Sequence, residues 1–411
     1  MPCSSKTRPP PRNADITFVE APEGAARSQG RLDEMGPPEA SFAEHPWVVL
    51  DDLIDQVDAR YKTDRSLAHK VVDIDIQCHF FEKETMYKRL LTLLALSASI
   101  STGLVQAQTK WDMPTPYPDS EFQTKNDVQF ADDVRKATNG ALDIKVHSAN
   151  SLIKNPEIKR AVQTGQVPIG ENFLPNLGPE DPVFELDAIP FFAASYKEAR
   201  VLLDVSRTVI NEKLMKQGLR ALYMVPWPSQ AFFTKKPINS VADLKGLKMR
   251  TYNAQTARLA QLMGVVPTTV QVTEIPQAFT SGMIDTMFTA ANTAVSTKAW
   301  DYTKNVYDTQ AWVPKNVVFV NEKAFQALPE SVRKIVLEQA AIAETRGWNW
   351  SQRENDEAPK ELVKNGMTLA NISPAFKTEL KKIGDEMLGD WLKKAGPDGK
   401  KIVDAYHAKL K

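Results

Sequence analysis

The feature that most constrains the fold is a regular alternation of short apolar runs with amphipathic segments from Thr109 onward. Runs with period 2 are typical of strands, and apolar residues three or four positions apart are typical of helices. Gly165 and Gly218 follow two of the amphipathic segments, as glycines that end helices do. Strands that alternate with helices of this length favour parallel sheets covered by helices on both faces, so we expect an α/β fold.

The alternation predicts strands over residues 109–113, 141–147, 166–170, 220–225, 247–252, 265–271, 283–288 and 315–321. It predicts helices over residues 120–138, 155–164, 196–217, 254–263 and 274–281. Residues 328–365 follow as one long helical pattern, in which Gly347 and Pro359 suggest bends. A helix of this length is unusual in one compact domain, so we expect it to pack across two. The helical tail over 375–410 leans basic and is expected to present a solvated face.

Residues 1–85 differ from the rest of the chain because they are rich in Pro, Gly, Ser and charge and lack sustained apolar periodicity. Such a segment buries too little apolar surface to offset the entropy of ordering, so we expect it to be disordered. Both cysteines, Cys3 and Cys78, lie in it, together with three of the five histidines. Their spacing matches no zinc pattern, and we expect no metal site there.

Residues 86–107 have the order of a secretory signal peptide: basic residues, an apolar core over Leu90–Leu96, and a small-residue cleavage site. A membrane anchor or a core helix is the alternative, but the apolar run is too short to span a bilayer. An export signal acts at an N-terminus, so we expect translation to start at Met86 and residues 1–85 to be an over-extended start. The mature protein would begin near Gln108 and be periplasmic.

Composition excludes several kinds of function. Lys plus Arg equals Asp plus Glu, 51 each, which gives no basic excess for nucleic acid. The mature part has no cysteine and only two histidines, His147 and His407, which excludes a cysteine nucleophile and disfavours zinc. No glycine-rich phosphate loop follows a strand. We therefore expect binding rather than catalysis, and no cofactor, although a pair of carboxylates acting as acid and base stays open.

Arg250 is the strongest candidate for a binding residue. It lies near the carboxyl end of the expected strand at 247–252, and ligands of open α/β sheets lie at the carboxyl ends of strands. A helix expected from Ala254 points its positive N-terminus at the same place, with Asn253 as its cap. A guanidinium beside a helix N-terminus suits a carboxylate, which it can clamp with two parallel hydrogen bonds. The alternative is an exposed arginine on an amphipathic strand.

Three blocks of the chain resemble the DctP-type substrate-binding proteins of TRAP (tripartite ATP-independent periplasmic) transporters. These blocks are DLKGLKMR at 243–250, QVTEIPQAFTSGMIDTMF at 271–288 and FVNEKAFQALPESVRKIVLEQAA at 319–341. The resemblance implies a two-lobed periplasmic binding protein with a long helix spanning both lobes. It implies Arg250 as the carboxylate anchor, and membrane subunits of the transporter as partners. The implied lobe I is 108–233 plus about 322–360, and the implied lobe II is 234–321 plus about 361–411.

The ligand implied by the resemblance is a small monocarboxylate. Sialic-acid-binding relatives carry a second arginine where this chain has Lys236, and an asparagine where it has Thr289. Other segments are similar to a subgroup for smaller monocarboxylates, pyroglutamate among them: WDMPTPYPDSEF, QVPIGEN, VPWPSQ, MRTYN and QAWVPKN. We therefore expect an extracytoplasmic receptor that delivers such an acid to a TRAP transporter. A periplasmic carboxylate-processing enzyme and a receptor that serves a sensor are the alternatives.

Further candidate ligand contacts are less specific. The Trp227 indole, between two prolines, could stack on a flat ligand and donate one hydrogen bond, or be a hinge or core aromatic. Trp312 invites the same two interpretations. Glu171 could accept a hydrogen bond from a ligand N–H or pair with Arg250. Three amides offer neutral hydrogen bonds, or serve as caps and turn residues: Asn253, Asn292 and Asn316.

Overall fold

The computed structural model describes residues 108–411, so the predicted extension and signal peptide lie outside the described residues. The strands are β1 Thr109–Pro114, β2 Leu142–His147, β3 Ile169–Phe173, β4 Leu219–Pro226, β5 Gln230–Thr234, β6 Lys248–Thr251, β7 Val266–Thr269, β8 Thr286–Ala290, β9 Asn305–Asp308, β10 Lys315–Asn321 and β11 Thr368–Asn371. The α-helices are α3 Phe122–Ala137, α4 Asn155–Thr164, α5 Tyr196–Lys216, α6 Ala254–Leu262, α7 Ile275–Thr280, α8 Ala291–Ser296, α9 Glu322–Gln326, α10 Glu330–Lys364 and α11 Pro374–Leu410. Within this part of the chain, no helix has the length and apolarity that crossing a membrane requires.

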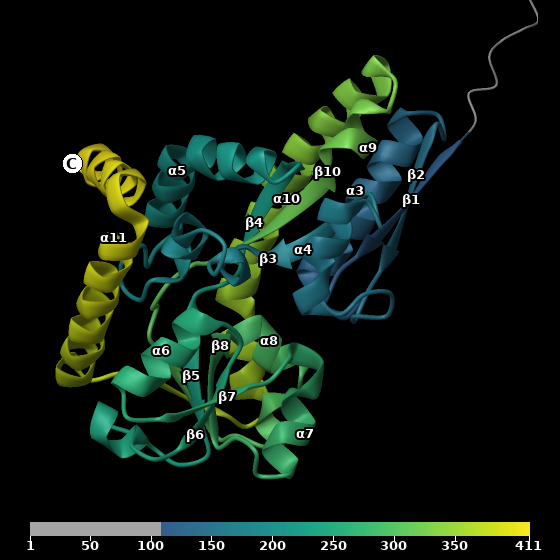
Figure 1. The fold of residues 1–411 in the computed structure, drawn as a ribbon. Coiled ribbons are helices and arrows are strands. Elements are labelled where there is room, and N and C mark those ends of the chain that lie inside the picture. The colour runs from purple at the N-terminus through teal and green to yellow at the C-terminus, as the bar shows by residue number, and fades with distance from the viewer. Residues whose placement is uncertain (1–107) are drawn as a thin grey trace, which may run out of the picture. The chain divides into compact units, whose positions relative to one another are not determined.

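Lobe I is built on β1, β2, β3, β10 and β4 (Figure 1). Strands β1 and β2 pair in parallel, and β10 pairs antiparallel with both β3 and β4. Strand β1 packs beside β3, which brings the two sheets of this lobe together. Helices α3 and α10 pack over these strands, and their buried apolar side chains form a core with strand residues such as Leu142, Tyr223 and Val318.

Lobe II is built on one six-stranded sheet in the order β11-β9-β5-β8-β6-β7. Strand β6 is parallel to both β7 and β8, whereas β5 is antiparallel to β8 and β9. Side chains from β5, α7, β8 and α10 meet in its core, among them Phe233, Phe279, Met287 and Leu362. The carboxyl end of β6 and the N-terminus of α6 therefore lie next to each other, as the sequence predicted.

The expectation of parallel sheets is met only in part: each lobe has parallel pairs, but β10 in lobe I and β5 in lobe II pair antiparallel with their neighbours. One lobe boundary also needs correction. We expected residues 234–321 in lobe II, but Lys315–Asn321 is β10, the central strand of the three-stranded sheet of lobe I. The reason is its pairing: both edges of β10 are hydrogen-bonded, to β3 on one side and to β4 on the other. Strand β5 belongs to lobe II, so the chain crosses between lobes just before β5 and just before β10.

The long helix spans both lobes, as predicted. Helix α10 packs against α3 and β4 in lobe I and against α8 and β11 in lobe II (Figure 1). It is helical throughout Glu330–Lys364, including the two positions where we expected bends. Gly347 has another role, because a Cβ added there would lie 2.4 Å from Cγ2 of Val225 in β4. The glycine allows helix and strand to approach each other closely.

Gly347→Ala is expected to destabilise the protein although alanine is the better helix former. The helix-propensity gain is about 1 kcal/mol, while forcing a methyl group into a filled contact costs roughly 1–3 kcal/mol. Urea unfolding should show a lower midpoint. Gly389→Ala in α11 is the matched control, because no atom lies within 4 Å of its added Cβ. That variant should be unchanged or slightly more stable, and a Gly347→Ala midpoint as high as that of the control would contradict the argument.

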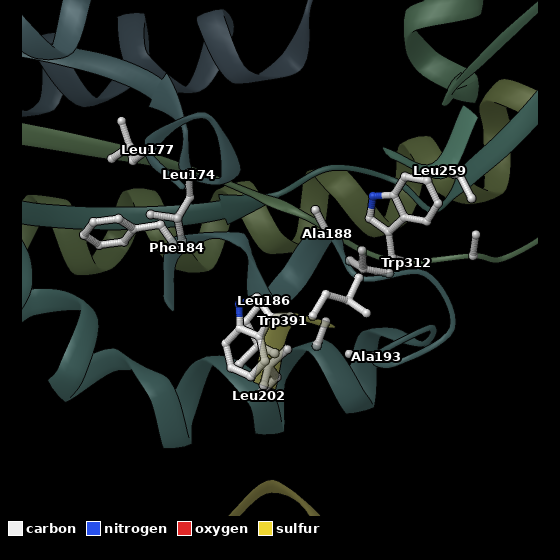
Figure 2. Close-up of a cluster of buried hydrophobic side chains, with 14 of the residues drawn as sticks. Leu174, Leu177, Phe184, Leu186, Ala188, Ala193, Leu202, Leu259, Trp312 and Trp391 are labelled. Carbon is white, nitrogen blue, oxygen red and sulfur yellow. The ribbon is translucent and has the colours of Figure 1, made fainter. Parts of the chain in front are cut away.

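The C-terminal helix is also a spanning helix, which corrects its assignment to lobe II as a solvated tail. Helix α11 packs against α5 and the 3₁₀ helix Pro182–Ala188 on the lobe I side and against α6 in lobe II. Trp391 of α11 is buried among apolar side chains that include Leu186 and Leu202 (Figure 2). Its indole N–H donates to the carbonyl oxygen of Pro182 at 2.5 Å. The basic composition of this segment led us to expect a solvated face and gave no sign of its apolar one.

Candidate ligand-binding site

A cavity lies between the two lobes and holds about 450 Å³ of empty space, open solvent at its mouth included. Lobe I lines it with Tyr117, Asn155, Phe173, Asn176 and Trp227. Lobe II lines it with Gln230, Arg250, Tyr252, Gln271, Val272, Thr289, Ala290 and Thr293. The lining is mainly aromatic and amide side chains, with Arg250 as its one formally charged side chain.

Arg250 is buried in the wall of this cavity, with 2% of its surface exposed. Its Nε donates to the carbonyl oxygen of Val270 at 3.0 Å, and Nη1 donates to Oγ1 of Thr289 at 3.4 Å. Its Cζ lies 5.1 Å from the centre of the Tyr252 ring. Burial lowers the pKa of the guanidinium to about 10, so it remains charged at neutral pH.

No carboxylate within residues 108–411 forms a salt bridge with Arg250. Other arginines, such as Arg220 and Arg346, do have carboxylate partners. A buried charge is costly unless it is paired and hydrogen-bonded. The two hydrogen bonds of Arg250 within the described residues are to neutral oxygens, so no carboxylate of that part of the chain is bonded to the guanidinium. The arrangement is therefore suited to an anion that enters the cavity.

Two aromatic pairs form walls of the cavity. Tyr117 and Trp227 meet edge-to-face with ring centres 4.9 Å apart, and Phe173 and Tyr252 do so at 5.6 Å. The second pair joins one ring from each lobe. Burial raises the pKa of Tyr252, so its hydroxyl stays neutral and donates to Oε1 of Gln230 at 3.1 Å. Such walls favour a small ligand with flat faces.

Asn316 and Glu171 lie behind this wall rather than in it. Oδ1 of Asn316 accepts from Nε1 of Trp227 at 2.8 Å and from the Tyr117 hydroxyl at 3.1 Å. Nδ2 of Asn316 donates to Glu171 at 2.6 Å, and Oγ1 of Thr115 donates to the other oxygen of that carboxylate at 2.5 Å. The Trp227 N–H that we expected to reach a ligand is thus used inside the protein. Glu171 pairs with Asn316 and Thr115, not with Arg250.

Three further predicted residues do not line the cavity. Oδ1 of Asn253 caps α6 by accepting from the Thr256 backbone N–H at 2.9 Å, as its cap role predicted. Trp312 belongs to the buried apolar cluster (Figure 2). Its ring is stacked on that of Phe288, with ring centres 4.7 Å apart. Asn292 contacts Glu121 of the other lobe. The partners of Trp312 and Asn292 are distant in sequence, so spacing does not reveal them.

Two amide oxygens in the cavity wall lack donors. Oδ1 of Asn155 and Oδ1 of Asn176 are buried and have no hydrogen-bond partner within the described residues. Nδ2 of Asn155 donates across the lobes to Oε1 of Gln271 at 3.1 Å. Sequence reasoning missed these amides, because a lone asparagine at a helix start or in a loop is more often a cap or turn residue. Buried acceptors of this kind are suited to ligand N–H or O–H groups.

The same part of the chain, residues 108–411, contains no cluster of three or more His, Cys, Asp or Glu side chains that could hold a metal ion. The site therefore consists of one guanidinium, neutral hydrogen-bonding groups and aromatic walls between two α/β lobes. Such a site defines the class of two-lobed solute receptors, whose ligand is enclosed between domains.

Comparison with known families identifies the family. The family described as "Bacterial extracellular solute-binding protein, family 7" (DctP) matches residues 115–394, so the chain belongs to it. The chain is an extracytoplasmic solute receptor of the TRAP type.

Solved structures of relatives have the same fold. DctP7 of Bordetella pertussis, an extracytoplasmic solute receptor binding pyroglutamic acid, is 47% identical with a TM-score of 0.72, covering 73% of this chain and 99% of that chain. DctP6 of the same organism, also binding pyroglutamic acid, is 45% identical with a TM-score of 0.72, covering 73% and 100%. A TRAP solute-binding protein of an unidentified marine microbe, specific for pyroglutamate, is 38% identical with a TM-score of 0.72, covering 73% and 99%.

Proposed function

We propose that this receptor captures a small monocarboxylate of the pyroglutamate class and delivers it to the membrane subunits of a TRAP transporter. The observation that carries the proposal is Arg250: a buried, charged guanidinium in the interlobe cavity without a carboxylate partner within residues 108–411. A ligand carboxylate would supply the missing charge and can accept two parallel hydrogen bonds from the guanidinium fork.

The rest of the cavity supports a ligand with one carboxylate and a polar ring. Arg250 is the one cation of the lining, so a second carboxylate would be buried without a counter-charge. Lys236, at the place where sialic-acid-binding relatives carry another arginine, is exposed and outside the lining. The acceptors on Asn155 and Asn176 would suit a ring N–H, and the aromatic pairs would cover the flat faces.

The three receptors that bind pyroglutamate support the same ligand class, since their identities of 47%, 45% and 38% extend over 73% of this chain. We infer that the lobes close around the acid, because a ligand stabilises the state for which it has the higher affinity. Receptors of this family bind solutes, and we propose that the acid is released chemically unchanged.

Calorimetric titration of the full chain with L-pyroglutamate, succinate and N-acetylneuraminate tests this function. We expect L-pyroglutamate to bind at least about 100-fold more tightly than either of the others, which corresponds to roughly 2.7 kcal/mol. Tighter binding of the dicarboxylate or of the sialic acid would contradict the proposed ligand class. Recovery of unaltered L-pyroglutamate after long incubation is expected, whereas product formation would indicate the carboxylate-processing enzyme.

A further inference from the structure

Glu121 of lobe I reaches into lobe II. It stands at the N-cap position of α3, but its side chain makes no capping hydrogen bond there. Instead Oε2 accepts from Nδ2 of Asn292 at 2.7 Å, and Oε1 accepts from Oγ of Ser296 at 2.6 Å. Both donors belong to α8, so each carboxylate oxygen of Glu121 is bonded to the opposite lobe.

This contact is buried and separate from the ligand cavity. Glu121 is 2% exposed and Asn292 5% exposed, and neither lines the cavity. Glu121 forms no salt bridge within residues 108–411. Two charges act on it without pairing with it: Lys125 of its own helix lowers the pKa of its carboxyl, and Glu354 of α10 raises it. The neutral hydroxyl of Tyr117 faces it as well. The carboxylate is therefore held between the lobes by two neutral donors.

We propose that Glu121, Asn292 and Ser296 form a latch that stabilises the closed lobes and weakens as the Glu121 carboxyl ionises. The latch rests on the proposed function, because lobe closure is what it would assist. Opening the lobes would separate Glu121 from α8 and return its side chain to water. Asn292 also offers an acceptor: its Oδ1 lacks a hydrogen-bond partner within the described residues and can accept from a protonated carboxyl.

The direction of the pH dependence follows from burial. In this structure, where Glu121 is buried between the lobes, burial raises the pKa of its carboxyl from 4.5 to about 7, and we take this value for the closed form. A group with a higher pKa in the closed form takes up a proton on closure, so closure is favoured at low pH and loses this contribution as pH rises from 4.5 to 7. With an open-form pKa near 4.5, the two values give a closing constant roughly 25-fold larger at pH 5.5 than at pH 8.0.

The two charges that would meet in the cavity do not change over this range. The pKa of Arg250, lowered by burial, is still about 10. A ligand carboxylate titrates near 3.5 and stays ionised. Glu185 is a second carboxyl that crosses the lobes, because it accepts from Nε2 of Gln255 at 2.6 Å, and burial raises its pKa too. The comparison is therefore best made in Glu185→Gln chains.

The test measures L-pyroglutamate affinity between pH 5.5 and 8.0 in the Glu185→Gln chain, with and without Glu121→Gln. With Glu121 present, we expect the affinity to fall roughly 25-fold from pH 5.5 to pH 8.0. With Glu121→Gln, we expect this fold-change to be at least about five times smaller. Glutamine keeps one acceptor and gains a donor that Asn292 can accept, so this variant should fold. Glu322→Gln, whose carboxylate pairs with Arg220 inside lobe I, is the control and should keep the full slope. Equal slopes with and without Glu121 would overturn the latch.

A second readout does not depend on the ligand. Spin labels on Val128→Cys in lobe I and Met283→Cys in lobe II, both on exposed positions, report the interlobe distance. Cys3→Ser and Cys78→Ser remove the other thiols. In the Glu185→Gln chain without ligand, we expect a larger short-distance population at pH 5.5 than at pH 8.0, and no such change when Glu121→Gln is added. A distance distribution that ignores pH would overturn the latch. Failure of L-pyroglutamate to bind, with the distance still responding, would overturn only the proposed ligand.

Discussion

Arg250→Ala is expected to abolish measurable binding of L-pyroglutamate. The variant would leave the ligand carboxylate buried between the lobes without a counter-charge, which costs roughly 3–5 kcal/mol. That free energy corresponds to an affinity loss of about a hundredfold to several thousandfold. Calorimetric titration at neutral pH measures it directly. Wild-type affinity in Arg250→Ala would contradict the assignment of Arg250 as the anchor.

Two comparisons separate this effect from damage to the fold. Arg250→Lys keeps the charge but loses the planar fork and should also weaken binding. The ligand-free Arg250→Ala chain should be at least as stable as wild type in urea, because burial already disfavours the charge of this guanidinium and lowers its pKa to about 10. A lower unfolding midpoint that accompanies the loss of binding would point to a structural role instead.

The sequence pattern predicted helices and strands well where the hydrophobic period was clear and where capping or turn residues marked the ends. The helix expected over 155–164 is α4, and the expected strand at 315–321 is β10. The pattern missed β5, whose five residues are all buried and show no alternation. The order of the strands could not be predicted from the sequence, because it depends on pairing between distant segments. Strand β10 lies in lobe I because it is hydrogen-bonded to β3 and β4. Local periodicity carries no information on such pairings.

The place of Arg250 in the cavity wall agrees with its expected position near a strand end and a helix start. Position alone left an exposed arginine as the alternative, and the family resemblance singled this residue out. Glu171 and Trp312 were not placed correctly, since the direction of a side chain depends on its tertiary partners. Glu171 lies on β3 next to the cavity wall, but Asn316 and Thr115 hold its carboxylate behind that wall. Trp312 lies between β9 and β10, in the segment that crosses between the lobes, yet it stacks on Phe288 in the core. The aromatic and amide lining had no local signal of its own.

A buried ion pair at the lobe junction gives the second large prediction. Lys315, the first residue of β10, is 1% exposed on its side chain, and Asp187 is 5% exposed. Nζ of Lys315 lies 3.0 Å from Oδ2 of Asp187, and the Lys315 backbone N–H donates to the same oxygen at 3.0 Å. Burial raises the pKa of Asp187, although the ammonium opposes this shift. Desolvation thus outweighs attraction, and the pair is costly to break rather than strongly stabilising.

Lys315→Met is expected to lower the free energy of unfolding by roughly 3–5 kcal/mol, because it leaves the Asp187 carboxylate buried beside an apolar side chain. Urea unfolding at pH 7 should show a much lower midpoint. A carboxyl whose pKa is raised in the folded state loses stability as pH rises through that pKa, so the deficit should shrink towards pH 4. Lys315→Met combined with Asp187→Asn should recover at least half of the loss, since the amide keeps an acceptor for the backbone N–H without a charge. A single variant as stable as wild type at pH 7 would contradict this account, because it would show that the buried carboxyl does not depend on the ammonium of Lys315.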